Sequence, residues 1–281
     1  MPAGRGFERF KARVLERDGS PLHYWTGGKP AGDALVLLHG AGTDHRTFAP
    51  QLPALEEAFR LVTWDARGHG LSRPMGSRFS FPLLRKDLLA IMDREKIAHA
   101  ILVGHSMGGN LAQEVARTAP ERVDALVLID CTRNAGQQTW SEGVAARLAP
   151  RVLSWYPWGA LVSAASHASS VNKEVRAYMT ECFRVLGHAD FTRIFLETSR
   201  CVHPDPEYRF GKPMLILAGD QDPTGNVRKV AERWANEEPD ATYVLIPNAG
   251  HAAHQDNPTA TNEALETFFA TLRGESGDNE G

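Results

Sequence analysis

A serine that could act as a nucleophile stands in residues 104–108, which spell G-H-S-M-G and fit the pattern G-x-S-x-G. The apolar run at residues 100–103 precedes this segment, and a helix-compatible stretch follows it. A serine at the tip of a strand-to-helix turn is crowded by its neighbours, so glycine is favoured two positions before it and two after it. Gly104 and Gly108 meet that requirement, and the pattern predicts that Ser106 is an exposed nucleophile.

A serine hydroxyl is a poor nucleophile at neutral pH, so it needs a base to accept its proton and a third group to orient that base. The predicted base is His251, in a glycine-containing loop after the last predicted strand. The predicted acid is Asp222, which follows the end of another strand, where α/β sheets place their active sites. The chain therefore contains candidates for all three roles.

Other side chains near predicted strand ends could compete for these roles. His254 follows the predicted base by three residues, and its alternative places are behind the site or on the surface. Asp220 is better suited to hydrogen-bonding the backbone of its own loop, and Asp130 is better suited to a turn or a pocket wall. His39 lies beside a glycine at a strand end and is expected to be a hydrogen-bonded structural histidine.

Attack of Ser106 on a carbonyl group would place negative charge on the carbonyl oxygen. Two backbone N–H groups aimed at that oxygen could stabilise the charge. We expect one of them from Met107, at the start of the helix after the serine. We expect the other from Ala41, in residues 39–42, whose glycines allow close approach of the backbone.

The sequence offers no pattern typical of a cofactor or metal site. Residues 65–72 are rich in glycine and charge, but they lack the G-x-x-x-x-G-K-[ST] arrangement of a phosphate loop. A tight loop pinned by Asp65 and Arg67 is expected there instead. No G-x-G-x-x-G follows a predicted strand, and no His, Cys or carboxylate cluster has metal-ligand spacing. We therefore expect neither a cofactor nor a metal.

Composition limits the classes of partner. The chain has 281 residues, 42% of them hydrophobic, and a net charge of -3 with scattered lysine and arginine, which does not favour nucleic acid. No apolar run approaches the ~18 residues of a membrane span, and no signal-type apolar block follows the N-terminus. Three cysteines are too few for a disulfide framework and are expected to be buried thiols. We expect a cytoplasmic protein with a small-molecule substrate.

Short apolar runs alternate with helical patterns, which is typical of a parallel sheet covered by helices on both faces. An antiparallel hairpin within residues 10–25 is expected at the sheet edge. The other strands are expected at residues 34–38, 61–64, 100–103, 125–129, 214–217 and 243–246.

About eighty residues without a strand pattern follow Asp130, too many for a plain loop. Within them, residues 172–186 and 188–200 carry the apolar faces of two helices. We interpret this region as a helical cap inserted into the core. The expected domains are core residues 1–131 and 212–274, cap residues 132–211, and a disordered tail at residues 275–281.

The cap region is rich in aromatic residues that could line a substrate pocket. Trp140, Trp155 and Trp158 are the candidates for substrate binding. Rings of this kind more often pack a cap onto its body, so each ring has a structural alternative.

Several of these segments resemble the α/β-hydrolase superfamily, and the resemblance covers nearly the whole chain. It implies a mostly parallel eight-stranded sheet with helices on both faces and an inserted helical cap. The family order of nucleophile, acid and histidine falls on Ser106, Asp222 and His251, and the oxyanion-hole donors fall on Ala41 and Met107. The segments are H-G-A-G at 39–42, D-A-R-G-H-G-L-S at 65–72, G-H-S-M-G-G at 104–109, D-Q-D-P at 220–223 and A-G-H at 249–251.

The resemblance leaves the reaction open, because this superfamily hosts esterases, lactonases, thioesterases, carbon-carbon bond hydrolases and perhydrolases. Serine at position 106 sets aside the dehalogenase and epoxide-hydrolase branches, which use aspartate. We expect cleavage of a small carboxylic ester or lactone through an acyl-Ser106 intermediate. The alternatives are a carbon-carbon bond hydrolase of a dienone from ring cleavage, and a ligand receptor on the same fold. A second substrate carboxylate would need a basic partner, and the candidates in this segment are Arg133, Arg184, Arg193 and Arg200.

Overall fold

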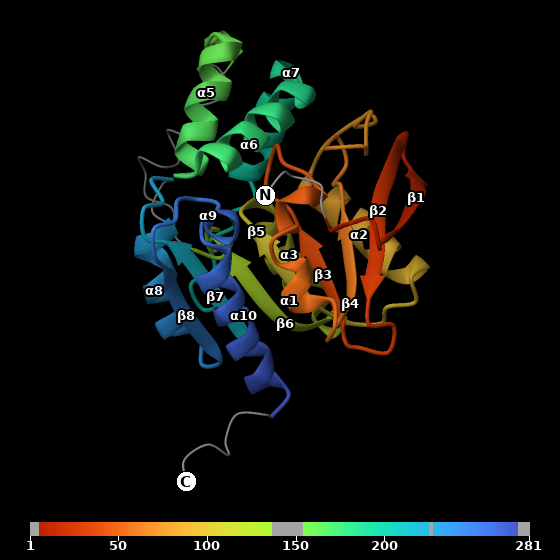
Figure 1. Ribbon diagram of the computed structural model, residues 1–281, viewed down its shortest axis with the longest axis vertical. Coiled ribbons are helices and arrows are strands. Elements are labelled where there is room, and N and C mark those ends of the chain that lie inside the picture. Colours follow the sequence, from red (N-terminus) through yellow and green to blue (C-terminus); the bar gives the residue numbers. More distant parts are fainter. Residues whose placement is uncertain (1–5, 137–153, 225–226, 275–281) are drawn as a thin grey trace.

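An eight-stranded sheet with helices on both faces forms the body of the protein (Figure 1). The computed structural model describes residues 6–136, 154–224 and 227–274. The strands lie side by side in the order β1-β2-β4-β3-β5-β6-β7-β8. Their bounds are Lys11–Arg17 (β1), Ser20–Gly28 (β2), Ala34–Leu38 (β3), Arg60–Trp64 (β4), Ala100–His105 (β5), Val123–Ile129 (β6), Met214–Gly219 (β7) and Ala241–Ile246 (β8).

The sheet is mostly parallel, as the sequence predicts. Strands β3 to β8 pair in parallel, whereas β2 pairs antiparallel with both β1 and β4. The hairpin β1–β2 turns at Asp18 and Gly19, which have φ angles of 47° and 74°. Two consecutive residues with positive φ match the turn that suits the twist of paired strands. The predicted hairpin at the sheet edge is confirmed.

Side chains of the central strands point alternately into two hydrophobic cores, one on each face of the sheet. Leu35 and Leu37 of β3 face one core, and Val36 and Leu38 face the other. The first core also contains residues of α1 (Leu52–Leu55) and α10 (Pro258–Leu272). The second contains residues of α2 (Phe81–Arg94), α3 (Met107–Thr118) and α8 (Val227–Glu237). Burial on both faces explains why these strands are continuous apolar runs.

Between β6 and β7, the described residues form three helices that stand over the carboxyl ends of the strands (Figure 1). They are α5 (Trp158–Ser169), α6 (Lys173–Leu186) and α7 (His188–Ser199), and we call them the helical insert. Helices α6 and α7 match the predicted apolar faces, while α5 was not predicted. The predicted tail at residues 275–281 lies outside the described residues. No described helix is both long and apolar enough to cross a membrane.

Three short helical segments complete the body. The segments at residues 45–48 and 253–256 follow β3 and β8 at the edge of the sheet that carries the predicted site, whereas the segment at residues 120–122 precedes β6 at the opposite edge. Their bounds are His45–Phe48 (η1), Pro120–Arg122 (η2) and Ala253–Asp256 (α9).

Candidate active site

Ser106 lies in the tight turn between β5 and α3, with φ 50° and ψ -116°. This strained conformation is sparsely populated for residues other than glycine and is typical of functional sites. A Cβ atom on Gly108 would overlap the carbonyl group of Leu38, and one on Gly104 would overlap the backbone of Gly108. The turn therefore requires glycine at both positions, and the predicted elbow is present.

The side chains of Ser106, His251 and Asp222 form a continuous hydrogen-bonded chain. The Nε2 atom of His251 lies 3.0 Å from the Oγ atom of Ser106. The Nδ1 atom of His251 lies 2.9 Å from Oδ2 of Asp222. The three residues follow β5, β7 and β8, whose carboxyl ends meet at one edge of the sheet. This is the arrangement in which a histidine can take a proton from the serine while the carboxylate orients the ring.

Thr224 holds the carboxylate of Asp222 from within the same loop, a contact that the sequence analysis missed. Its hydroxyl donates to Oδ1 of Asp222 at 2.6 Å, and its backbone N–H donates to the same atom at 2.7 Å. The hydroxyl oxygen also lies 2.7 Å from Nδ1 of His251. Aspartate followed closely by threonine commonly forms such a turn, and this was the available sequence signal.

The electrostatics of this trio favour a charged pair. Burial raises the pKa of Asp222, but the hydrogen bond and charge of His251, with the bonds from Thr224, outweigh burial and leave this pKa below its ordinary value. Burial lowers the pKa of His251, but the bond and charge of Asp222, with the charge of Asp130, leave this pKa above its ordinary value. The site therefore stabilises the imidazolium form of the histidine.

The two competing aspartates both bind backbone near the trio. Asp130 is fully buried and accepts N–H bonds from Gly219 at 2.8 Å and from Ala253 at 2.9 Å. Burial raises the pKa of Asp130 to about 8. Asp220 accepts a 3.0 Å bond from the N–H of Ala249. Asp130 therefore ties the end of β7 to the residues after the predicted base and lines the cavity, which matches its predicted place. Asp220 ties its loop to the loop of the histidine, whereas the prediction placed its hydrogen bond within its own loop.

The competing histidines are buried and engaged elsewhere. Nε2 of His254 lies 3.0 Å from the hydroxyl of Thr47, and burial lowers the pKa of His254 to about 3. The ring is fully buried, so it lies behind the site and not on the surface. His39 donates from Nδ1 to the carbonyl of Gly40 at 2.8 Å and accepts the N–H of Ala66 at 2.9 Å. The prediction that His39 is structural is confirmed.

The residues predicted to supply the oxyanion donors both lie near the serine. Met107 is the first residue of α3, and the first N–H groups of a helix have no partner inside the helix. Ala41 lines the same cavity as Ser106. The loop turns sharply there, because Gly42 has a φ of 79° and the N–H of Thr43 returns to the carbonyl of Gly40 at 3.2 Å.

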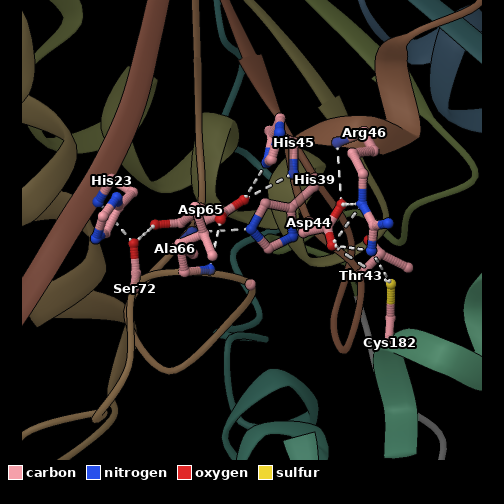
Figure 2. Close-up of polar contacts among 12 residues, drawn as sticks. His23, His39, Thr43, Asp44, His45, Arg46, Asp65, Ala66, Ser72 and Cys182 are labelled. Atoms are coloured by element: carbon pink, nitrogen blue, oxygen red, sulfur yellow. Dashed lines mark hydrogen bonds and ion pairs between the residues drawn. The ribbon is translucent and has the colours of Figure 1, made fainter. Parts of the chain in front are cut away.

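The neighbouring loop at residues 65–72 is pinned as predicted. Oδ1 of Asp65 accepts the backbone N–H of His45 at 2.9 Å and its Nδ1–H at 2.8 Å (Figure 2). The fully buried Arg67 forms a two-pronged ion pair with Asp87, at 2.8 Å and 3.1 Å. These contacts hold the loop at both Asp65 and Arg67.

A group of side chains beside this loop has the composition of a metal site. Asp44, His45 and Asp65 offer ligand atoms that all lie within 4.8 Å of one another. However, Asp65 accepts the Nδ1–H of His45, and Asp44 pairs with Arg46 at 2.7 Å (Figure 2). The donor atoms are therefore engaged within the protein, and the group is explained as a structural network.

A cavity of about 470 Å³ lies between the trio and the helical insert. This volume is in the range of small-molecule sites. Ser106 and His251 contribute to its wall together with mainly apolar side chains from the insert and α8. The apolar wall residues are Ala41, Ala165, Ala168, Met179, Phe183, Phe195, Val202, Val227 and Val230.

The predicted tryptophans do not belong to the described part of this wall. Trp155 is 89% exposed, and Trp158 packs inside the insert against His188 and Phe191, with ring centroids 5.2 Å and 5.3 Å apart. The prediction that these two rings line the pocket is therefore wrong. Trp140 lies outside the described residues. The aromatic wall residues are Phe183 and Phe195, which the helical periodicity of α6 and α7 could have indicated.

The arginines considered for a second substrate carboxylate are engaged or exposed. Arg133 reaches the cavity wall, but its guanidinium binds Glu237 at 2.5 Å, Glu238 at 3.4 Å and the carbonyl of Tyr208 at 2.9 Å. The other three candidate arginines, Arg184, Arg193 and Arg200, are exposed.

Comparisons with known proteins agree with this architecture. The chain is 29% identical over 254 residues to the sn-1-specific diacylglycerol lipase of Mus musculus, covering 84% of this chain and 81% of that protein. It is 24% identical over 274 residues to 3-oxoadipate enol-lactonase 2 of Acinetobacter baylyi, covering 92% and 97%. A thermophilic esterase from Thermogutta terrifontis superposes with a TM-score of 0.79 at 20% identity, covering 93% and 99%. The family model of the alpha/beta hydrolase fold matches residues 33–258, and the chain belongs to this family.

Proposed function

We propose that this protein is a serine hydrolase that cleaves a small carboxylic ester or lactone. The observation that carries the proposal is the pair of hydrogen bonds that joins His251 to Ser106 at 3.0 Å and to Asp222 at 2.9 Å, beside a largely apolar cavity. Relatives named as a lipase and an enol-lactonase support a reaction at a carboxylic ester bond.

The first half of the proposed reaction forms an acyl-enzyme. Oγ of Ser106 attacks the carbonyl carbon of the substrate while Nε2 of His251 takes the hydroxyl proton. Charge moves to the carbonyl oxygen, which accepts hydrogen bonds from the backbone N–H groups of Ala41 and Met107. When the tetrahedral intermediate collapses, the imidazolium gives its proton to the leaving alcohol. For a lactone, this alcohol stays attached to the acyl group.

The second half releases the acid. His251 takes a proton from a water molecule, whose oxygen attacks the acyl carbon on Ser106. The proton then returns to Oγ of Ser106 as the carboxylic acid leaves. Asp222 keeps the ring oriented in both halves and stabilises its positive charge, and Thr224 keeps Asp222 in place.

The cavity favours an uncharged acyl group. The described wall is mainly apolar, and its one arginine, Arg133, already pairs with Glu237 and Glu238. A substrate carboxylate would have to compete with these ion pairs or remain unpaired in an apolar site, which is costly. We therefore propose a neutral ester or lactone of modest size.

Labelling with a fluorophosphonate probe tests the assignment of Ser106. The wild type is expected to be labelled at Ser106 and to hydrolyse short nitrophenyl esters, whereas Ser106→Ala loses labelling and roughly 10⁴-fold or more of the activity. Ser169→Ala is the matched control, because it removes a hydroxyl from the same cavity wall. Equal labelling of the wild type and Ser106→Ala would refute the proposal.

A substrate comparison separates the ester hydrolase from its carbon-carbon alternative. The wild type is assayed with nitrophenyl esters of increasing acyl length and with a dienone product of aromatic ring cleavage. An ester hydrolase prefers the esters by a large factor in kcat/KM. A strong preference for the dienone would instead establish the carbon-carbon reaction at the same serine.

A further inference from the structure

Helix α6 of the insert lies directly against the loop that carries the oxyanion donor Ala41. The ring of Phe183 is 2.6 Å from the point where a Cβ atom of Gly42 would stand. Gly42 also has a φ of 79°, a conformation that other residues rarely adopt. The helix therefore touches the backbone one residue away from Ala41, with no side chain between them.

A buried hydroxyl fixes the far end of the same loop. Tyr178 of α6 donates to Oδ1 of Asp44 at 3.0 Å, and its oxygen lies 3.3 Å from the backbone N and from the backbone O of Asp44. The thiol of Cys182, one turn later, lies 3.5 Å from Oδ2 of the same carboxylate. Tyr178 and Asp44 are both buried. The hydroxyl of Tyr178 therefore holds Asp44 through both its side chain and its backbone.

An ion-pair layer surrounds this contact. Arg46 donates to Oδ2 of Asp44 at 2.7 Å (Figure 2). It also donates to Oε1 of Glu181 at 3.1 Å, so it bridges the body and α6. A buried carboxylate is costly unless its oxygens are paired. The hydrogen-bond partners of the Asp44 carboxylate come from both η1 and α6. The carboxylate oxygens therefore have all these partners only when the loop and α6 keep this relative position.

The other side of the insert is anchored to the histidine loop. Oδ2 of Asp256 accepts the N–H of Gly250 at 2.8 Å and the N–H of Val171 at 3.0 Å. The N–H of Ala252 donates to the carbonyl of Ser169 at 2.8 Å. The turn between α5 and α6 is therefore bonded directly to Ala252 and Asp256, and through the carboxylate of Asp256 it is linked to Gly250, the residue before the predicted base. Because these bonds fix this end of the insert, they also help to hold α6 in a constant position against the loop of Ala41.

We propose that Tyr178 is a positioning residue for the oxyanion hole. Its hydroxyl holds Asp44 and, with Phe183 against Gly42, fixes the direction of the Ala41 N–H. This inference rests on the proposed serine hydrolase function. It gives α6 a role in stabilising the transition state, in addition to forming the wall of the cavity.

The substitution Tyr178→Phe tests this role, because it removes the hydroxyl and keeps the ring. Hydrolysis of an ester is compared with that of the matching thionoester, whose carbonyl sulfur is a weak hydrogen-bond acceptor. We expect kcat for the ester to fall roughly tenfold with KM nearly unchanged, since misdirection of one donor removes stabilisation only in the transition state. The thionoester should lose less, so the ester-to-thionoester ratio of kcat falls.

Tyr24→Phe is the matched control. Tyr24 is also buried, and its hydroxyl also donates to a carboxylate, Oε1 of Glu95 at 2.8 Å, but it belongs to β2. The control is expected to lose thermal stability without a change in the ratio. Phe183→Leu, which loosens the contact with Gly42, is a second variant in case Tyr178→Phe does not fold, and it should lower the ratio as well.

An unchanged ester-to-thionoester ratio in folded Tyr178→Phe and Phe183→Leu would overturn the inference and leave α6 with a purely structural role. Failure of the proposed function is a separate outcome. It would appear as wild-type protein that the fluorophosphonate does not label at Ser106. Labelling of the wild type with an unchanged ratio in the variants therefore rejects the positioning role alone.

Discussion

The elbow of Ser106 and the helical insert meet at one cavity, but they are held in place by different means. At the elbow, backbone packs against backbone, and a methyl group on Gly108 has no space beside Leu38. The insert is attached through side chains, chiefly the carboxylates of Asp44 and Asp256 and their partners. Main-chain geometry thus fixes Ser106, the proposed nucleophile, whereas side-chain contacts fix the shape of the cavity above it.

The two regions also differ in what they contribute to the cavity. The hydrogen bonds between His251, Ser106 and Asp222 connect loops that the sheet itself brings together. The apolar wall opposite them comes largely from the insert, with Phe183 and Phe195 as its aromatic members. Changes in the insert that keep the contact of Tyr178 with Asp44 are therefore expected to alter which acyl group fits the cavity of the proposed hydrolase without moving Ser106, His251 or Asp222.

The largest expected effect comes from adding a methyl group to a glycine of the elbow, and the same change at a glycine of the insert serves as the comparison. Gly108→Ala should lower the free energy of unfolding by about 3 kcal/mol or more, because the new Cβ would overlap a carbonyl that cannot move without the strand. Gly159→Ala, in α5, has nothing within 4 Å and should be neutral or gain up to about 1 kcal/mol. Chemical denaturation of both variants measures the contrast.

Similar losses in the two glycine variants would contradict the distinction between the elbow and the insert. A stable Gly108→Ala that still reacts with a fluorophosphonate would show that the elbow can relax. In that case backbone contact with Leu38 would not be what fixes Ser106.

The elbow and the catalytic loops could be predicted from sequence because their requirements are local. Glycines two residues either side of Ser106, and loops directly after strand ends, appear as short patterns. The order of strands in the sheet then brings these loops together, which explains why Asp222 and His251 lie within hydrogen-bonding distance of each other. Thr224 was missed although it lies only two residues from Asp222, since many threonines follow an aspartate without this role.

Contacts of the insert could not be predicted in this way. Tyr178 and Asp44 are 134 residues apart in sequence, and nothing local in either segment indicates their pairing. The same limitation explains the error at Trp155. The periodicity of a helix identifies its apolar face, but the packing angle decides whether a given ring reaches the cavity.

An effect of intermediate size is expected from the charged carboxylate of Asp44, which joins the insert to the body. Burial raises the pKa of Asp44, but the hydrogen bonds and charge of Arg46 outweigh burial and lower this pKa to about 2. A carboxyl group with a lowered pKa in the folded state stabilises the fold above its unfolded pKa, and this contribution is lost as pH falls through the folded pKa. The shift corresponds to about 2 kcal/mol, lost progressively between roughly pH 4 and pH 2.

Asp44→Asn isolates this contribution from those of other carboxylates. At neutral pH the variant should unfold more easily than the wild type, by about 2 kcal/mol. Below roughly pH 4 the difference between the two proteins should shrink, because the wild type loses the same charge. Urea denaturation at a series of pH values measures the difference, and a gap that stays constant down to pH 2 would assign the loss to packing rather than to charge.

The smallest expected effect concerns two aromatic residues of the same insert. Phe195 lines the cavity and stacks on Phe191 at 4.2 Å, whereas Trp155 is 89% exposed. Phe195→Ala should raise KM for esters with longer acyl groups by up to about tenfold, since it removes apolar contact worth roughly 1 kcal/mol, and Trp155→Ala should leave kcat and KM unchanged. Steady-state kinetics over a series of acyl lengths checks both variants. If Trp155→Ala weakened binding and Phe195→Ala did not, the insert would hold the substrate by a different face, and side-chain contacts at the present cavity wall would not determine selectivity.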